Sequence, residues 1–264
     1  MRLPIYQIDA FTDRVFGGNP AAVVPLDSWL PDATLQGIAA ENNLAETAFF
    51  VPEGDGWRLR WFTPVVEVDL CGHATLASAS LIFSHLKPGL TRARFQTRSG
   101  LLEVTKQGDV LAMDFPTRMP VRVDDPALAD GLAKALGAAP DEVWKARDVL
   151  AVYRKAADVA GLRPDFTAIA RLDAWAVLAT APGDAPGVDF VSRFFAPSHG
   201  IPEDPVTGSA HCELIPYWAR RLGKTKLSAR QISARRGVLE CEHRGERVTI
   251  AGKAVLYLEG SIFV

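Results

Sequence analysis

The stretch RWFTP at Arg60–Pro64, followed by GHA at Gly72–Ala74, decides the fold because the chain repeats it. RFFAP at Arg193–Pro197 is followed in the same way by GSA at Gly208–Ala210. Two further pairs of segments keep the same order, namely RSGLLEV (98–104) with RRGVLEC (235–241) and KQGD (106–109) with HRGE (243–246). A chain that repeats a unit over half its length is predicted to contain two copies of one supersecondary domain.

Length and residue pattern agree with this duplication. The chain has 264 residues, which suits two domains of roughly 100–150 residues each. The Pro-rich, polar segment 116–126 marks the boundary, so we expect domains at 1–118 and 119–264, with the last strand free to cross back to the first domain. We further expect a pseudo-twofold axis between the two domains and a shared cleft.

Secondary structure follows from the apolar spacing along the chain. Helices are predicted at 31–43, 75–86, 127–137, 141–143 and 210–222. Strands are predicted at 3–11, 21–25, 47–51, 57–62, 92–97, 101–106, 110–115, 148–155, 174–180, 193–195 and 254–258, with a second meander across 231–246. Each copy thus has many strands and one helix that is apolar on all sides, and such a helix must be buried. The predicted class is α+β, with a sheet wrapped around a central apolar helix in each domain.

Composition excludes several functional classes. Hydrophobic residues make up 48% and charged residues 23%, and the formal net charge is -2. No basic stripe points to nucleic acid or to a membrane surface, and no apolar run approaches the roughly 20 residues that span a bilayer. Cys71, Cys212 and Cys241 lack metal-ligand spacing and are expected to be reduced thiols. The N-terminus reads as a strand and not as a signal peptide, so we expect a cytoplasmic protein.

The two repeated helix starts are the first candidates for a binding site. Gly72 and Ala74 open one apolar helix, and Gly208 and Ala210 open the other. Free N–H groups and the helix dipole attract an anion to such an end, and glycine lets a ligand approach the backbone. The alternative is that the glycines only form tight turns. Because both copies keep the feature, we interpret the four residues as binding a small carboxylate-bearing substrate.

Polar residues beside these helix starts are candidates for catalysis. His73 can serve as an acid or base near neutral pH, or it can simply cap its own helix. Asp204 can orient a substrate or tune His73, although an aspartate before a proline is common in turns. Ser209 can bind a substrate oxygen or act as an N-cap.

Glu46 is the sharpest candidate for a general base. It stands at the start of the apolar strand 47–51, where a carboxylate is partly desolvated and becomes a usable base near neutral pH. The alternative is a strand-end charge that points to water. Asn19, in the loop GGNP, either contacts a ligand or holds the loop, and its sequence context favours the second role.

Cys71 precedes the first helix start, where a thiol can be a nucleophile or a proton carrier. The alternative is a small buried residue. The second copy carries no thiol at the matching position, near Val206 and Thr207. A racemase with two thiols is therefore not supported, and Cys71 stays only a candidate nucleophile or base.

Four stretches together resemble the phenazine biosynthesis PhzF-like family. They are DAFTDRVFGGNPAAV (9–23), NLAETAFF (43–50), RWFTPVVEVDLCGHATLASA (60–79) and FAPSHGIPEDPVTGSAHC (195–212). They lie in both halves, so the resemblance covers essentially the whole chain. It implies the fold of diaminopimelate epimerase, with two similar domains and the active site between them.

The resemblance also implies residue roles. In the family's isomerase, the glutamate of the NLAET-type motif is the acid/base, which corresponds to Glu46. The assisting residues correspond to His73, Asp204 and Ser209. The implied reaction is isomerisation of trans-2,3-dihydro-3-hydroxyanthranilate, in which one carboxylate moves a proton between ring carbons on one face, without cofactor or metal. The chain departs at Cys71, where the phenazine isomerase has a small or apolar residue.

Three functional hypotheses follow. The leading one is a cofactor-independent isomerase of a small carboxylate, with Glu46 as acid/base. The second is an epimerase or racemase that uses Cys71 with Glu46 or His73 on the opposite face. The third is a non-enzymatic binding protein. The family resemblance further suggests a homodimer, and the substrate itself is not named by the sequence.

Overall fold

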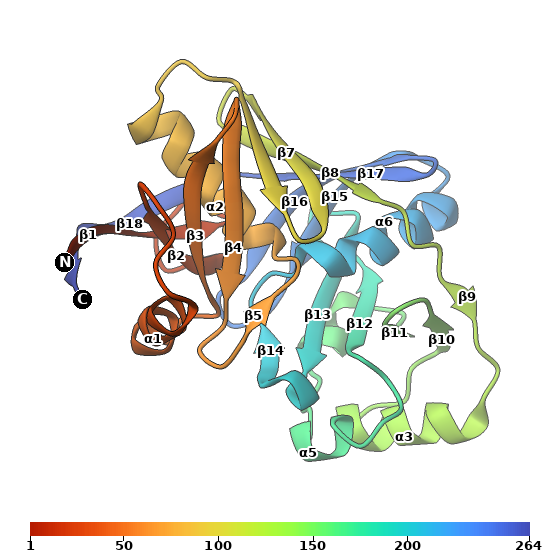
Figure 1. Ribbon diagram of the computed structural model, residues 1–264. Coiled ribbons are helices and arrows are strands. Elements are labelled where there is room, and N and C mark those ends of the chain that lie inside the picture. Colours follow the sequence, from red (N-terminus) through yellow and green to blue (C-terminus); the bar gives the residue numbers. More distant parts are fainter. The chain divides into compact units, whose positions relative to one another are not determined.

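The computed structural model describes residues 1–264, which form two compact units (Figure 1). Unit 1 contains residues 1–114 and 251–264, and unit 2 contains residues 115–250. The last strand, β18 (Ala254–Phe263), belongs to unit 1 and pairs antiparallel with the first strand, β1 (Arg2–Ala10). No helix of the chain combines the length and the apolar character needed to cross a membrane.

Unit 1 is built on one continuous run of paired strands. Its order is β18, β1, β2, β3, β4, β6, β7 and β8, and the short β5 pairs with β4. The added strands are β2 (Asn19–Pro25), β3 (Glu46–Glu53), β4 (Gly56–Phe62), β5 (Glu67–Val68), β6 (Arg92–Thr97), β7 (Gly100–Gln107) and β8 (Val110–Pro116). Its helices are α1 (Asp32–Asn42), α2 (Gly72–Leu81) and the π-helical turn η1 (Ile82–Leu86).

Unit 2 repeats this scheme. Its strands are β9 (Val121–Arg122), β10 (Glu142–Lys145), β11 (Val149–Val152), β12 (Val177–Pro182), β13 (Phe190–Ala196), β14 (Ile201–Asp204), β15 (Lys226–Gln231), β16 (Gly237–Arg244) and β17 (Arg247–Gly252). Its helices are α3 (Pro126–Leu136), α4 (Ala156–Ala160), α5 (Phe166–Ile169), the 3₁₀ turn η2 (Pro197–His199) and α6 (Gly208–Leu222).

The strand pairings of the two units correspond one to one. In unit 1, β2 and β3 are parallel, β3 and β4 antiparallel, and β4 and β6 parallel again. In unit 2 the same relations hold for β11 with β12, β12 with β13, and β13 with β15. A short return strand, β5 or β14, leads in each case into the main helix. The sequence repeat is thus also a repeat of topology.

Each unit buries its main helix, as the all-round apolar pattern predicted. Eight of the ten residues of α2 are buried, and α2 packs against β1, β2 and β3. Its two buried hydroxyl groups bond to backbone carbonyls one turn earlier: Thr75 Oγ1 donates to the Cys71 carbonyl at 2.6 Å and Ser78 Oγ to the Ala74 carbonyl at 2.8 Å. Both hydroxyls are therefore hydrogen-bonded although the helix has no face toward water.

Helix α6 contains a proline in its interior without losing its backbone pairing. Pro216 has no N–H, so the carbonyl of Cys212, four residues earlier, cannot be paired within the helix. The backbone N–H of Arg118 donates to this carbonyl at 2.9 Å instead. The segment that enters unit 2 thus completes the hydrogen bonding of its main helix.

The repeated arginine has the same structural role in both units. Arg60 on β4 makes a two-pronged ion pair with Glu67 on β5, with N···O distances of 2.7 and 2.8 Å. Arg193 on β13 makes the same pair with Glu203 on β14, again at 2.7 and 2.8 Å. Each arginine also lies 5.0 Å from the ring of the phenylalanine two residues on. The pair fixes the return strand that leads into the main helix.

The structure corrects two element predictions and adds five short elements. Residues 141–143 do not form a helix, because Glu142–Lys145 is a strand, β10, paired with β11. The segment is too short for a stable helix, whereas Val143 and Trp144 favour a pleated strand. The helix expected at 75–86 begins at Gly72 and ends as a π-helical turn, and the short elements β5, β9, β14, α4 and α5 were not predicted.

Candidate active site

Four predicted site residues of unit 1 lie together. Asn19 is the first residue of β2, Glu46 is the first residue of β3, and Cys71 and His73 flank the first residue of α2. The parallel pairing of β2 with β3 places Glu46 opposite Ala21, and α2 packs against both strands. The ends of three elements therefore converge on one small cluster.

Glu46 and His73 form the centre of this cluster. Glu46 Oε2 lies 3.1 Å from His73 Nε2, which is within ion-pair distance. Glu46 is 8% exposed and His73 is 4% exposed. The expected burial of the Glu46 carboxylate is therefore present, and the histidine ring turns toward the carboxylate rather than capping its helix. A carboxylate with little access to water and an imidazole in contact with it can pass a proton between them.

Asn19 and Cys71 contact the other side of the imidazole. Asn19 Nδ2 lies 3.1 Å from His73 Nδ1, and Cys71 Sγ lies 3.5 Å from the same nitrogen. When the imidazole is neutral, the Asn19 amide donates to Nδ1, and the ring proton then sits on Nε2, facing Glu46. Asn19 is completely buried, and its amide lies against the imidazole.

The buried charges shift the pKa values in this cluster. Burial, with a further contribution from the Glu46 charge, raises the pKa of Cys71 to about 11. Burial acts to lower the pKa of His73, but the charge of the Glu46 carboxylate and the hydrogen bonds with Cys71 and Glu46 outweigh it, and the pKa lies well above its usual value. At neutral pH the thiol therefore keeps its proton.

The glycine pair before Asn19 has a steric reason. Gly18 has φ of +62°, and a Cβ at this position would lie 2.0 Å from the Ala10 carbonyl oxygen. Only glycine fits such a conformation and such a close approach. The turn between β1 and β2 is thereby tight enough to place Asn19 under the imidazole.

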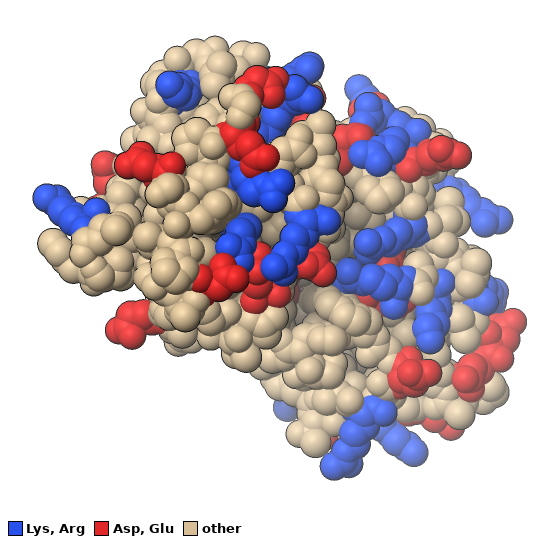
Figure 2. Space-filling view, viewed as in Figure 1, with Lys and Arg blue, Asp and Glu red and all other residues tan.

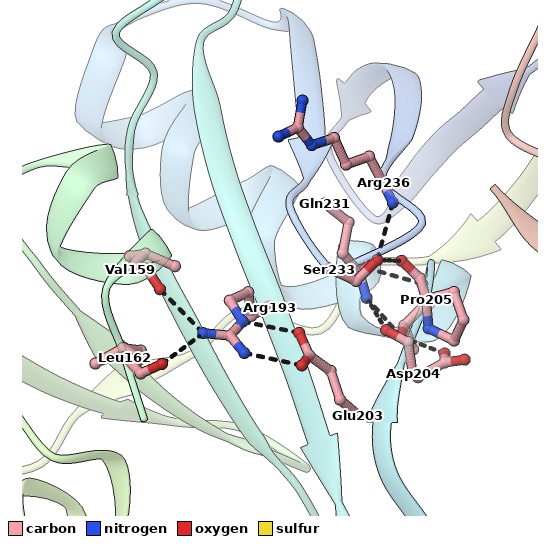
Figure 3. Close-up of polar contacts among 10 residues, drawn as sticks. Val159, Leu162, Arg193, Glu203, Asp204, Pro205, Gln231, Ser233 and Arg236 are labelled. Carbon is pink, nitrogen blue, oxygen red and sulfur yellow. Dashed lines mark hydrogen bonds and ion pairs between the residues drawn. The ribbon is translucent and has the colours of Figure 1, made fainter. Parts of the chain in front are cut away.

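Unit 2 holds its own polar group around Asp204 (Figure 3). The hydroxyl of Thr207 donates to Asp204 Oδ2. Gln231 Nε2 donates to the Asp204 carbonyl at 2.7 Å, and Gln231 Oε1 accepts from the Thr207 N–H at 2.9 Å. Ser233 Oγ donates to the Pro205 carbonyl at 2.8 Å. The Asp204 carboxylate thus has a fixed orientation at the start of α6.

Sequence reasoning missed Gln231 and Thr207. Gln231 ends β15, is completely buried and bonds to the loop that carries Asp204. It lies 27 residues from Asp204 along the chain, so no local motif identifies it. The sequence marks Thr207 only as a residue near the position that matches Cys71, although its three-residue separation from Asp204 is the spacing of a capping turn.

The helix-start residues occupy the expected backbone positions. Gly72 and Gly208 are the first residues of α2 and α6, and Ala74 and Ala210 are buried in the first turns. Neither Cys71 nor Thr207 caps its helix through its side chain. Ser209 is partly buried in the first turn of α6.

The surface shown in Figure 2 carries acidic and basic side chains side by side. Many of them are paired, among them Arg60 with Asp32, Arg98 with Glu67 and Arg94 with Asp55. This arrangement matches the small net charge of the sequence.

Comparison with known proteins gives one consistent result. The family model described as "phenazine biosynthesis-like protein" matches residues 8–260. A curated protein of Pseudomonas aeruginosa, named as an uncharacterized isomerase, is 55% identical over 262 residues and covers 99% of both chains.

Solved structures agree with this assignment. A crystal structure of a PhzF-family phenazine biosynthesis protein from Enterococcus faecalis is 47% identical, with full coverage of both chains and a TM-score of 0.96. A predicted epimerase from Pseudomonas aeruginosa is 23% identical over 99% of both chains, with a TM-score of 0.77. At that identity the likeness shows the fold alone, which is shared between isomerase and epimerase relatives.

Proposed function

The chain belongs to the phenazine biosynthesis-like family, and on this premise we propose that it is an isomerase that moves a proton within a small carboxylate-bearing substrate. The curated relative that is 55% identical is named as an isomerase, which supports this reaction class. The substrate class follows the family resemblance, in which the reaction is isomerisation of trans-2,3-dihydro-3-hydroxyanthranilate.

One observation carries the proposal, namely the contact of the buried Glu46 carboxylate with His73. Glu46 removes a proton from one carbon of the substrate and returns it to another carbon on the same face. His73 Nε2 lies 3.1 Å from the Glu46 carboxylate. It stabilises the carboxylate while this is charged, and the contact weakens once the carboxylate carries the substrate proton. Asn19 holds the imidazole in place through Nδ1. No step of this scheme requires a cofactor.

The substrate carboxylate is assigned to the helix starts. Gly72 and Ala74 open α2, and Gly208 and Ala210 open α6. Backbone N–H groups at a helix N-terminus favour an anion because of their unpaired donors and the helix dipole. We propose Asp204 and Ser209 as assisting residues, with the orientation of Asp204 fixed by Thr207.

The competing epimerase scheme needs Cys71 as a base on the opposite face of the substrate. Burial raises the pKa of this thiol to about 11, so a thiolate is scarce near neutral pH. Cys71 is therefore poorly suited to remove a proton, and the scheme with a single carboxylate is favoured.

The test is solvent deuterium incorporation by a Glu46→Gln variant, with trans-2,3-dihydro-3-hydroxyanthranilate as the first substrate to be assayed. Gln keeps the shape of the side chain but cannot accept and return the proton. We expect turnover and deuterium uptake to fall by about 10²–10⁴-fold. Glu41→Gln, at an exposed position on α1, is the matched control and should behave as wild type.

Two results would contradict the proposal. Deuterium uptake by Glu46→Gln at the wild-type rate would remove Glu46 from the reaction. Equal losses in Glu46→Gln and Glu41→Gln would show that the effect comes from stability and not from proton transfer.

A further inference from the structure

The cluster of Glu46, Cys71 and His73 contains one sulfur, one nitrogen and one oxygen ligand atom close together. All three lie within 4.8 Å of one another. Thiolate, imidazole and carboxylate are the three ligand types of protein zinc sites. Hard cations such as Mg²⁺ prefer oxygen ligands and octahedral geometry, so this ligand set selects a softer ion.

The separations fit a tetrahedral ion. Zinc–ligand bonds of about 2.0–2.3 Å place neighbouring tetrahedral ligands roughly 3.3–3.6 Å apart. The measured separations are 3.1 Å for His73 Nε2 to Glu46 Oε2 and 4.0 Å for Cys71 Sγ to His73 Nε2. The third separation, between Cys71 and Glu46, is at most 4.8 Å, so side-chain shifts of up to about 1 Å bring all three ligands to bonding distance of one ion.

Hydrogen bonding supports the same reading. Glu46 Oε2 is buried yet has no hydrogen-bond partner, although His73 Nε2 lies within ion-pair distance. A buried polar atom without a partner calls for a physical explanation. When Nε2 binds an ion, the ring proton moves to Nδ1. The Asn19 side chain, which meets Nδ1 through Nδ2, then turns its amide oxygen toward this N–H and supplies the outer acceptor that metal-bound histidines use.

The charges also balance. A carboxylate from Glu46 and a thiolate from Cys71 supply two negative charges to a divalent ion, with His73 neutral. Cys71 immediately precedes the first residue of α2, and the bound ion displaces the proton of its thiol, because metal binding to cysteine releases that proton. Three protein ligands leave the fourth tetrahedral position for water, as in open zinc sites.

We propose that Glu46, Cys71 and His73 bind one thiophilic divalent cation, Zn²⁺ or Co²⁺, and that the bound ion inhibits the enzyme. Binding of the ion is inferred from the geometry of the three side chains. Inhibition rests on the proposed function, because a carboxylate bound to the ion can no longer accept a proton from the substrate.

The test uses Co²⁺ as a spectroscopic probe on the full chain, purified without added thiols. We expect one Co²⁺ per chain, tetrahedral ligand-field absorption in the visible range and a thiolate-to-cobalt charge-transfer band in the near ultraviolet. Cys71→Ser should lose the charge-transfer band, and Zn²⁺ but not Mg²⁺ should displace the cobalt. Cys241→Ala, at another buried cysteine, is the matched control and should keep the full spectrum.

Absence of the charge-transfer band in the wild-type protein would overturn the metal site, and so would a band that persists in Cys71→Ser. The wild-type spectrum tests the metal site even if a variant folds poorly. Circular dichroism would reveal such misfolding. If the cobalt spectrum is present while the Glu46→Gln variant turns over normally, the proposed function fails and the metal site stands. If the cobalt spectrum is absent while Glu46→Gln loses turnover, the metal site fails and the proposed function stands.

Discussion

At Cys71, burial decides the chemistry of the side chain more than its position beside a helix start does. The residue is 6% exposed, and burial raises the pKa of the thiol to about 11. A helix N-terminus alone would lower the pKa. In this protein desolvation and the nearby Glu46 carboxylate are stronger, so the free thiol is protonated and unreactive.

We therefore predict slow alkylation of Cys71 in the native protein. With iodoacetamide near neutral pH, the native chain should label at Cys71 at least about tenfold more slowly than the unfolded chain, because only the thiolate reacts. Peptide mass spectrometry after timed quenching measures the rates. Rapid labelling with protection by substrate would instead support the epimerase scheme.

A second prediction for a single residue concerns Asn19 and the orientation of the His73 ring. Removing its amide in Asn19→Ala leaves only the longer Cys71 Sγ contact at His73 Nδ1, at 3.5 Å, so the ring loses its main orienting partner. We expect kcat to fall by up to about 10⁴-fold, the loss seen when a catalytic histidine is no longer held in the right tautomer. At a pH above the pKa of His73, where the ring is neutral, the nitrogen chemical shifts of His73 should show a mixture of tautomers in the variant. An unchanged tautomer and an unchanged kcat would show that Asn19 does not position the ring.

At the scale of elements, the arginine–glutamate pairs hold the return strands that lead into α2 and α6. The side chains of Arg193 and Glu203 are 12% and 20% exposed, and Arg193 also donates to the Val159 and Leu162 carbonyls. Because the partners are only partly solvated, loss of one leaves a poorly hydrated charge.

We predict that Glu203→Gln lowers the free energy of unfolding by about 1–3 kcal/mol. Glu53→Gln removes an ion pair of similar length whose side chains are 53% and 43% exposed, and should cost less than about 1 kcal/mol. Urea denaturation of both variants measures the difference. Equal effects would mean that the Arg193 pair does not hold β14 in place.

Elements with a strong local signal were predictable from the sequence. Helices α2 and α6 were found because both are rich in apolar residues and a glycine starts each, and β3 because it is a continuous apolar run. The two-residue strand β5 and the four-residue β14 have too few residues for a periodic pattern. Gln231 is tied to Asp204 only through tertiary contact, so its role was not visible before the structure.

At the scale of the whole molecule, duplication of the strand order was the most reliable inference, because it rests on several segments that keep the same order. The buried side chains that connect distant elements could not be inferred in this way. Glu213 on α6, for example, is completely buried and accepts weakly from the backbone N–H of Asp148, at 3.4 Å. No neighbouring residue in the sequence marks this contact.

Glu213 gives a prediction for the pH dependence of stability. Burial raises its pKa from 4.5 to about 7, so between these values the folded chain keeps a proton that the unfolded chain releases. Stability therefore falls as pH rises through this window. Between pH 5 and pH 8, wild type should lose about 1–3 kcal/mol more than Glu213→Gln. Urea denaturation at both pH values measures this, and equal losses would contradict the assignment.

The central claim is that one carboxylate, Glu46, carries the proton and that Cys71 does not. The most direct measurement compares the turnover of Glu46→Gln with that of Cys71→Ala under identical conditions on one substrate. The proposed mechanism predicts a loss of about 10²–10⁴-fold for Glu46→Gln and activity near that of wild type for Cys71→Ala. A large loss in Cys71→Ala together with an active Glu46→Gln would contradict it.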